Sequence, residues 1–62
     1  MKSARQSKII ELIEEYDIMT QEELSERLLQ AGYSTTQATI SRDIRELKLT
    51  KITTDSGKPK YA

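Results

Sequence analysis

The 62-residue sequence contains no cysteine and no histidine, and these two absences exclude several classes of function. Without cysteine there is no disulfide and no thiolate metal ligand. Without histidine the commonest general base and the commonest metal ligand are both missing. Ser41 therefore has no histidine partner for a catalytic triad, and an enzyme is not expected. The same absences favour a reducing, cytoplasmic setting.

Long apolar runs are also missing. No stretch approaches the roughly 20 residues that a membrane span needs. The N-terminal stretch MKSARQSK is basic but lacks the apolar region of a secretion signal. The length suits one small domain, so we expect a single domain over residues 1–62 with no membrane segment.

Neither sign of charge is in excess, but the charges are segregated along the chain. Residues 1–8 carry three basic side chains and no acidic one. Residues 9–34 carry seven acidic side chains and one arginine, whereas residues 35–62 carry six basic and three acidic side chains. A neutral total can therefore hide one basic and one acidic face, which keeps a nucleic-acid partner possible.

A first helix is predicted to begin with Ser3 as its N-cap. Its apolar residues recur at a helical spacing that gives one buried stripe, formed by Ile9, Ile10, Leu12, Ile13 and Tyr16. Residues 17–19 interrupt this pattern, so the helix is expected to end before them.

A second helix is predicted from the capping box that starts at Thr20, with Glu23 reaching back to the N-cap. Leu24, Leu28 and Leu29 continue it on one side. Gly32 suits the left-handed residue that often ends a helix.

A third helix is predicted to begin with Thr36 as N-cap. At about 100° per residue, Ile40, Ile44 and Leu47 fall within a narrow arc that faces the core. The remaining side chains are small, hydroxylated or charged. Asp43 lies at the edge of the core-facing side and is expected to pair with a basic side chain of the first helix or of the following hairpin.

The period changes after Lys48. Residues 49–54, LTKITT, are rich in β-branched side chains and alternate as a strand does. Residues 55–57 have turn chemistry, with Gly57 free to take a positive φ. Residues 58–62 would return as a second strand, in which Pro59 should face an open edge because it has no N–H to donate.

The order helix, helix, helix, hairpin predicts a mainly α fold with a small β-hairpin, the winged helix-turn-helix. In that fold the third helix enters the DNA major groove, and the hairpin, or wing, lies along the backbone or minor groove. Arginine can donate two hydrogen bonds to guanine, and small side chains allow close approach of the helix. The candidate groove contacts on the third helix are Gln37, Ala38, Thr39, Ser41, Arg42 and Arg45. The candidate contacts with the DNA backbone are Lys8, Gln21, Thr36, Lys51, Lys58 and Lys60.

The segment TQATISRDI, residues 36–44, resembles the recognition helix of bacterial arginine repressors. TQEEL, residues 20–24, is similar to the start of their second helix, and LKLTKI, residues 47–52, is similar to the entry to their wing. The resemblance runs from about Ser7 to Tyr61. It implies specific groove contacts by Ser41 and Arg42, with Gln37 and Thr39 close by.

The resemblance also implies a regulator of arginine metabolism that binds palindromic operators in double-stranded DNA. It implies a second, C-terminal domain that binds L-arginine as corepressor and assembles a homo-hexamer. That domain is expected to be absent from these 62 residues, which would then be monomeric and hold no cofactor or metal.

A protein-interaction module is the main alternative, since some winged helices bind proteins and the acidic first two helices offer a surface for it. The carboxylate pairs Glu14-Glu15 and Glu22-Glu23 are interpreted as solvated helix faces rather than metal sites.

Overall fold

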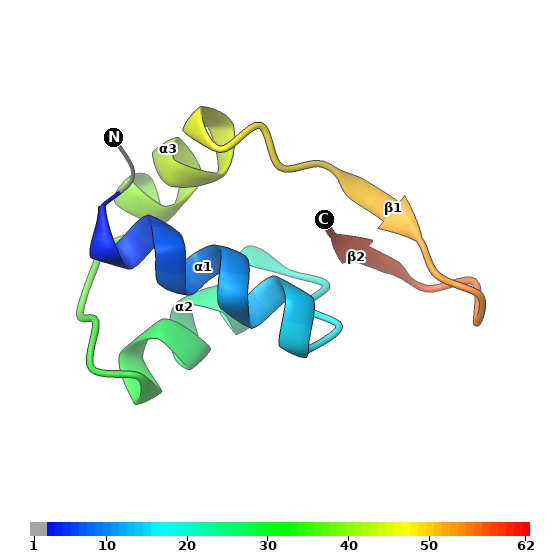
Figure 1. Ribbon diagram of the computed structural model, residues 1–62, viewed down its shortest axis with the longest axis horizontal. Helices are drawn as coiled ribbons and strands as arrows, with labels where there is room; N and C mark the ends of the chain where they lie inside the picture. The colour runs from blue at the N-terminus through cyan, green and yellow to red at the C-terminus, as the bar shows by residue number, and fades with distance from the viewer. Residues whose placement is uncertain (1–2) are drawn as a thin grey trace.

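The computed structural model describes residues 3–62 and contains three helices followed by a β-hairpin. The helices are α1 (Ala4–Glu15), α2 (Gln21–Gln30) and α3 (Gln37–Glu46), and the strands are β1 (Lys51–Thr53) and β2 (Pro59–Tyr61). The helices form one cluster, from which the hairpin extends to one side (Figure 1). The predicted winged helix-turn-helix order is confirmed. Lys2, one of the basic residues counted near the N-terminus, lies outside the described residues.

Each helix begins at the predicted cap. The side chains of Ser3, Thr20 and Thr36 accept hydrogen bonds from the backbone N–H groups of Gln6, Glu23 and Thr39, respectively. A hydroxyl in this position satisfies one of the N–H groups that the first helical turn leaves without a partner. The capping box at Thr20 differs in one detail, since Glu23 Oε1 accepts from the N–H of Met19, at 3.4 Å, instead of Thr20.

Helices α2 and α3 end in the same way. Beyond α2, Gly32 has φ +94°, and the N–H of Tyr33 donates to the carbonyl of Leu28. Beyond α3, Lys48 has φ +58°, and the N–H of Leu49 donates to the carbonyl of Ile44. Both are Schellman motifs. The left-handed cap at Gly32 was predicted, but a lysine in that conformation was not, because only glycine adopts it without steric cost.

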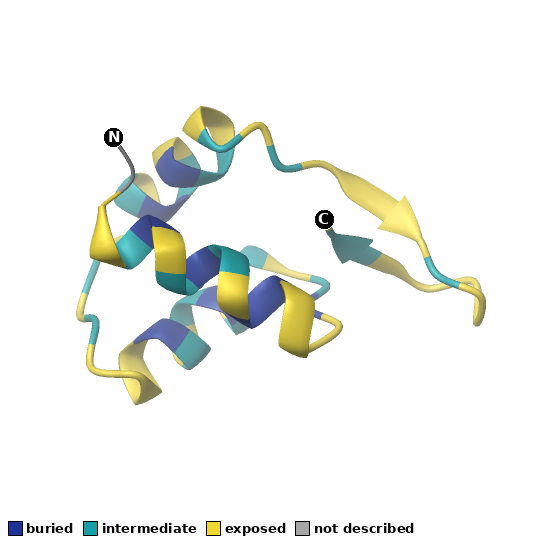
Figure 2. Cartoon of the chain, in the orientation of Figure 1, coloured by how far each residue is buried: buried dark blue, intermediate teal, exposed yellow. Residues whose placement is uncertain are grey.

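The core is built where the three helices face each other (Figure 2). Its buried residues are Ile9, Leu12, Ile13, Ile18, Leu24, Leu28 and Ile40. Ile18 was missed because it lies in the connection between α1 and α2, yet its side chain is fully buried. Its carbonyl also accepts the N–H of Tyr61, at 2.9 Å, which ties the hairpin to the helices.

Two predicted core positions are wrong. Tyr16 is 38% exposed because α1 ends at Glu15 and the backbone turns extended there, so the ring packs against the guanidinium of Arg27 at 3.7 Å. Leu29 is 62% exposed, since it lies about 100° around α2 from the buried Leu28.

Candidate nucleic-acid interface

Helix α3 has one face against the core and one face open to solvent. Ile40 is fully buried, and Ile44 and Leu47 pack against the core from the same side. On the opposite side, Ala38, Arg42 and Arg45 are exposed. The outer face therefore carries two cationic side chains beside a methyl group, with no large apolar residue that would obstruct a groove.

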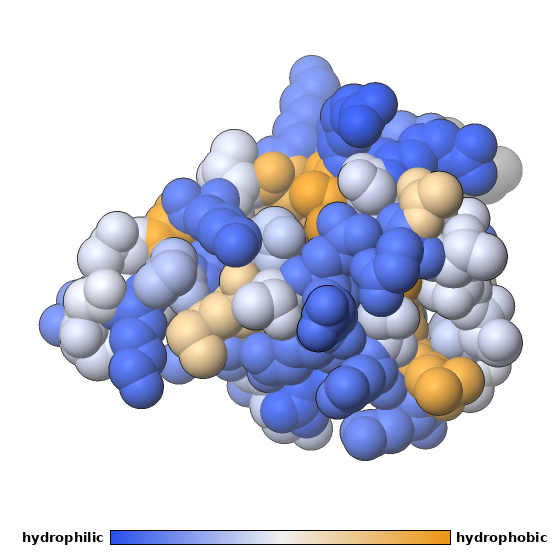
Figure 3. Space-filling model, turned by 180° about the vertical axis from the view of Figure 1, so that it is seen from behind, coloured by the Kyte–Doolittle hydropathy of each residue, from blue (hydrophilic) through white to orange (hydrophobic). Residues whose placement is uncertain are grey.

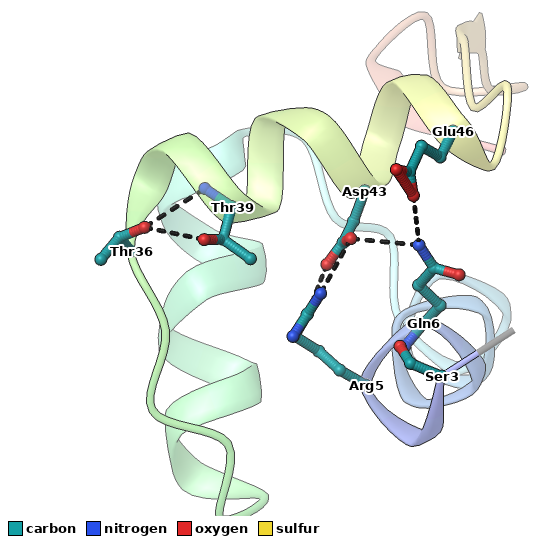
Figure 4. Close-up of polar contacts among 7 residues, drawn as sticks. All are labelled: Ser3, Arg5, Gln6, Thr36, Thr39, Asp43 and Glu46. Carbon is teal, nitrogen blue, oxygen red and sulfur yellow. Dashed lines mark hydrogen bonds and ion pairs between the residues drawn. The ribbon is translucent and has the colours of Figure 1, made fainter.

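Asp43, on the inner side of α3, is only 1% exposed and is held by side chains from α1 (Figure 4). Arg5 forms a two-point ion pair with it: Nε donates to Oδ2, and Nη2 donates to Oδ1 at 3.0 Å. Gln6 Nε2 adds a third hydrogen bond to Oδ1, at 3.1 Å. Pairing with a basic side chain of the first helix, one of the two options predicted for Asp43, is confirmed.

The surroundings of Asp43 and Arg5 shift their pKa values in opposite directions. The hydrogen bond from Arg5 holds the pKa of Asp43 below its ordinary value of 3.8, against the opposing effect of burial. The hydrogen bond to Asp43 raises the pKa of Arg5 above its ordinary value. Both groups are therefore charged at neutral pH.

Gln6 also reaches the second carboxylate of α3. Its Nε2 donates to Glu46 Oε2 at 2.9 Å, so one amide nitrogen contacts Asp43 and Glu46 together (Figure 4). By sequence α3 is neutral, with two arginines and two acids. In space the acids face α1 and the arginines face solvent, so the outer surface of the helix is basic.

The N-terminal end of α3 is ordered by hydroxyl and amide contacts. The hydroxyl of Thr36 accepts the N–H of Thr39 and donates to Thr39 Oγ1 at 3.0 Å (Figure 4). Gln21, at the start of α2, donates from Nε2 to the backbone oxygen and to Oε1 of Gln37. These contacts hold the first turn of α3 in place. Ser41, one turn further along the helix, is half-buried.

The wing, defined here as residues 51–61, supplies a second group of cations. Its strands pair antiparallel, with Lys51 opposite Tyr61 and Thr53 opposite Pro59. The predicted turn residue Gly57 has φ +83°. Lys51 and Lys58 are exposed, whereas Lys60 lies 3.4 Å from Asp17 Oδ1.

The predicted interface residues do not all lie together. Gln21 contacts Gln37 at the N-terminal end of α3, whereas the wing lysines lie on the hairpin. Lys8 is apart from both: its Nζ pairs with Glu11 at 3.3 Å, and it borders a shallow groove between α1 and α2 with Tyr16 and Arg27. Charge near the N-terminus suggested Lys8, but charge alone does not tell which face a side chain occupies.

The sequence did not predict the roles of Arg5 and Gln6, although it did predict that Asp43 would pair with a basic side chain. The only signal available for them was that Arg5 is one of the few basic residues near the start of the chain. Gln6 gave no signal, because a glutamine on a predicted helix is usually exposed.

The acidic side chains counted between residues 9 and 34 lie mostly on the exposed sides of α1 and α2. Viewed from behind, the surface is mainly hydrophilic, with a few separate hydrophobic patches (Figure 3). Within residues 3–62 no cluster of acidic side chains has a geometry suited to a metal ion. No helix in this described part is long and apolar enough to cross a membrane.

The three helices, the wing and the basic outer face of α3 define a winged helix-turn-helix domain of the DNA-binding class. Comparison with protein families assigns it further. The family described as arginine repressor, DNA binding domain, matches residues 1–62, and the chain belongs to this family.

Individual relatives agree with this assignment. The chain is 69% identical over 61 residues to the arginine repressor of Lachnoclostridium phytofermentans, covering 98% of this chain and 40% of the relative. It is 63% identical over 62 residues to that of Caldicellulosiruptor saccharolyticus, covering all of this chain and 41% of the relative. It is 61% identical over 62 residues to that of Alkaliphilus oremlandii, covering 100% of this chain and 42% of the relative. The chain thus spans about 40% of the length of these relatives.

Proposed function

We propose that this chain binds double-stranded DNA sequence-specifically, with α3 in the major groove and the wing along the backbone. The observation that carries the proposal is the sorting of charge on α3. Its two carboxylates are bound by α1 and its two arginines are exposed on the outer face. The proposed groove contacts are Gln37, Ala38, Thr39, Ser41, Arg42 and Arg45, and the proposed backbone contacts are Gln21, through the N–H groups at the start of α2, Thr36, Lys51, Lys58 and Lys60. Lys8 is left out because it lies on the α1–α2 side.

The family supports a wider role as part of an arginine-responsive transcriptional regulator acting in the cytoplasm without enzymatic activity of its own. In this proposal L-arginine is the corepressor and binds a further domain outside these 62 residues. That domain would also assemble the protein into a homo-hexamer on a palindromic operator. Support comes from the names of the relatives and from their greater length.

Arg42→Ala is expected to lose groove recognition without unfolding the domain. The side chain is exposed opposite the buried Ile40, so its removal leaves the core unchanged. Losing a two-point contact with a base costs about 1–3 kcal/mol and relaxes specificity at one position. Titration of an operator duplex and a scrambled duplex, with circular dichroism as the check on folding, measures both effects.

Arg42→Lys is the matched control, since it keeps the charge and removes the planar fork. We expect it to retain binding to scrambled DNA and to lose discrimination for operator. A folded Arg42→Ala variant that binds operator as tightly as the wild type would show that this face is not the one that reads DNA.

Lys58→Ala and Lys60→Ala are each expected to weaken binding to all sequences equally, because in this proposal the wing lysines contact phosphate groups, which are the same in every sequence. Each lost phosphate contact reduces the magnitude of the negative slope of log K against log salt by roughly 0.9. Lys60 must first leave Asp17, but an exposed ion pair at 3.4 Å adds little stability. Titrations at several salt concentrations measure the slopes.

Lys8→Ala removes the same charge from the α1–α2 side and is expected to leave the slope unchanged. If Lys58→Ala and Lys60→Ala keep the wild-type slope, as Lys8→Ala is expected to, the wing does not lie on the DNA backbone. The protein-interaction alternative, based on the acidic surfaces of α1 and α2, predicts no salt-dependent affinity for duplex DNA at all.

A further inference from the structure

The contact between Gln21 and Gln37 determines how both side-chain amides are oriented. Gln21 Nε2 lies 3.1 Å from the backbone oxygen of Gln37 and 2.8 Å from Oε1 of the same residue. A backbone carbonyl can only accept a hydrogen bond, so the Gln21 atom facing it must be the amide nitrogen. That nitrogen has a second hydrogen to donate, so the side-chain atom of Gln37 that it meets must be the oxygen.

This arrangement leaves the donor end of Gln37 available. One lone pair of Oε1 is occupied by Gln21, whereas neither hydrogen of Gln37 Nε2 is hydrogen-bonded to an acceptor within residues 3–62. Gln37 is exposed and is the first residue of α3. The N-terminal residues of a recognition helix are those that meet base edges in helix-turn-helix proteins.

We propose that Gln21 is a positioning residue that decides which bases Gln37 can read, an inference that rests on the DNA binding proposed above. With Nε2 directed outward, Gln37 donates to O6 and N7 of guanine or O4 of thymine, and disfavours the amino group of cytosine. The start of α2 suggested a phosphate contact for Gln21 through its backbone N–H groups, and that expectation is separate from the side chain. The side-chain Nε2 donates to Gln37, so we assign the side chain to orienting Gln37.

The test uses Gln21→Glu, which replaces the donor by a group that only accepts. The new carboxylate cannot donate to the Gln37 carbonyl, but it can accept from Gln37 Nε2 once the Gln37 amide turns over. Oε1 then faces outward and accepts from N4 of cytosine or N6 of adenine. An acid in the first turn of α2 suits the helix dipole, so the fold is expected to persist, with circular dichroism as the check.

Binding is measured by competition on duplexes in which each half-site position carries each of the four base pairs in turn. In the wild type we expect about two- to tenfold discrimination against cytosine at one position, the range for one hydrogen bond. Gln21→Glu should reverse this preference at the same position, whereas Gln21→Ala should flatten it. Gln37→Ala should also flatten it, and adding Gln21→Glu to Gln37→Ala should change the profile no further.

Gln30→Glu is the matched control, because it introduces the same charge at the exposed C-terminal end of α2. It is expected to leave the preference at every position unchanged. Equal weakening of all sequences by Gln21→Ala and Gln21→Glu would make Gln21 an ordinary phosphate contact, and unaltered profiles in both variants would make it irrelevant; either result overturns the proposal.

A second measurement needs no DNA and separates failure of this inference from failure of the proposed function. In the free protein, both side-chain amide protons of Gln21 should exchange with water more slowly than those of Gln30, as observed by nuclear magnetic resonance. If the wild type prefers no duplex over a scrambled one, the proposed function fails while this measurement still decides whether the amides are held. If the Gln21 protons exchange as fast as those of Gln30, the orienting contact does not exist and the inference is wrong.

Discussion

Arg5→Met is expected to lower the free energy of unfolding by about 3–5 kcal/mol, the cost of leaving a buried charge without its partner. Methionine keeps an unbranched side chain at this position but cannot donate to the carboxylate of Asp43. Asp43 is 1% exposed, so water cannot easily replace the lost hydrogen bonds. Small domains have little stability to lose, so a large part of the population should be unfolded. Urea denaturation followed by circular dichroism measures the change.

The double variant Arg5→Met/Asp43→Leu is the control, because replacing both members of a buried pair by apolar residues is often nearly neutral. We expect it to recover most of the stability lost in Arg5→Met. A loss below about 1 kcal/mol in the single variant, a value typical of exposed ion pairs, would mean that Asp43 is hydrated and that α1 does not hold α3 through it.

The same pair gives a pH dependence with a definite sign. The pKa of Asp43 is below 3.8 in the folded protein, so its contribution to stability is complete above about pH 4. This contribution is lost as the pH falls through the folded pKa. In Arg5→Met, loss of the hydrogen bond from arginine should raise the pKa of Asp43 relative to the wild type, so protonation relieves the cost at a higher pH. The difference in unfolding free energy between the two proteins should therefore shrink on acidification from pH 7 to pH 3. A constant difference would contradict the assignment.

Joining two copies of the domain is expected to raise affinity for a paired half-site by about 10²–10⁴ over one copy, without any new contact. One copy offers a single recognition helix, and the acidic surfaces of α1 and α2 oppose its attraction to DNA. We therefore expect affinity roughly in the micromolar range for one half-site. The backbone of the domain extends 31 Å along its longest axis and 23 and 19 Å along the others, dimensions comparable with half-sites one helical turn, about 34–36 Å, apart.

A Gly/Ser linker of about 40 residues has an average span close to that spacing. The control is the same duplex with one half-site scrambled, on which the joined protein should lose its advantage. Adding L-arginine should change neither affinity, since its site is proposed to lie outside these residues. Nanomolar binding of one copy to one half-site, or a clear response to L-arginine, would contradict this account.

The helices and strands, and their order, could be predicted from the residues alone. Ser3, Thr20 and Thr36 were recognisable as caps because each bonds a backbone group three residues away. The motif around Ser41 and Arg42 was sufficient to identify the family, because it is a continuous stretch of chain. Such signals are readable because cause and effect lie within a few residues of each other.

The contacts that hold α3 in place, and the charge of its outer face, come from the packing of the helices and could not be predicted. Arg5 and Asp43 are 38 residues apart, and Gln21 and Gln37 are 16 apart, so neither pair has a spacing that predicts contact. Ile18 is buried in the core although it lies in the connection between α1 and α2, where helical spacing predicts nothing about burial. The neutral composition of α3 turned into a basic outer face because packing against α1 placed its two acids on the inner side. Helical spacing predicts which residues share a face, but a charged side chain finds its partner only when the helices pack.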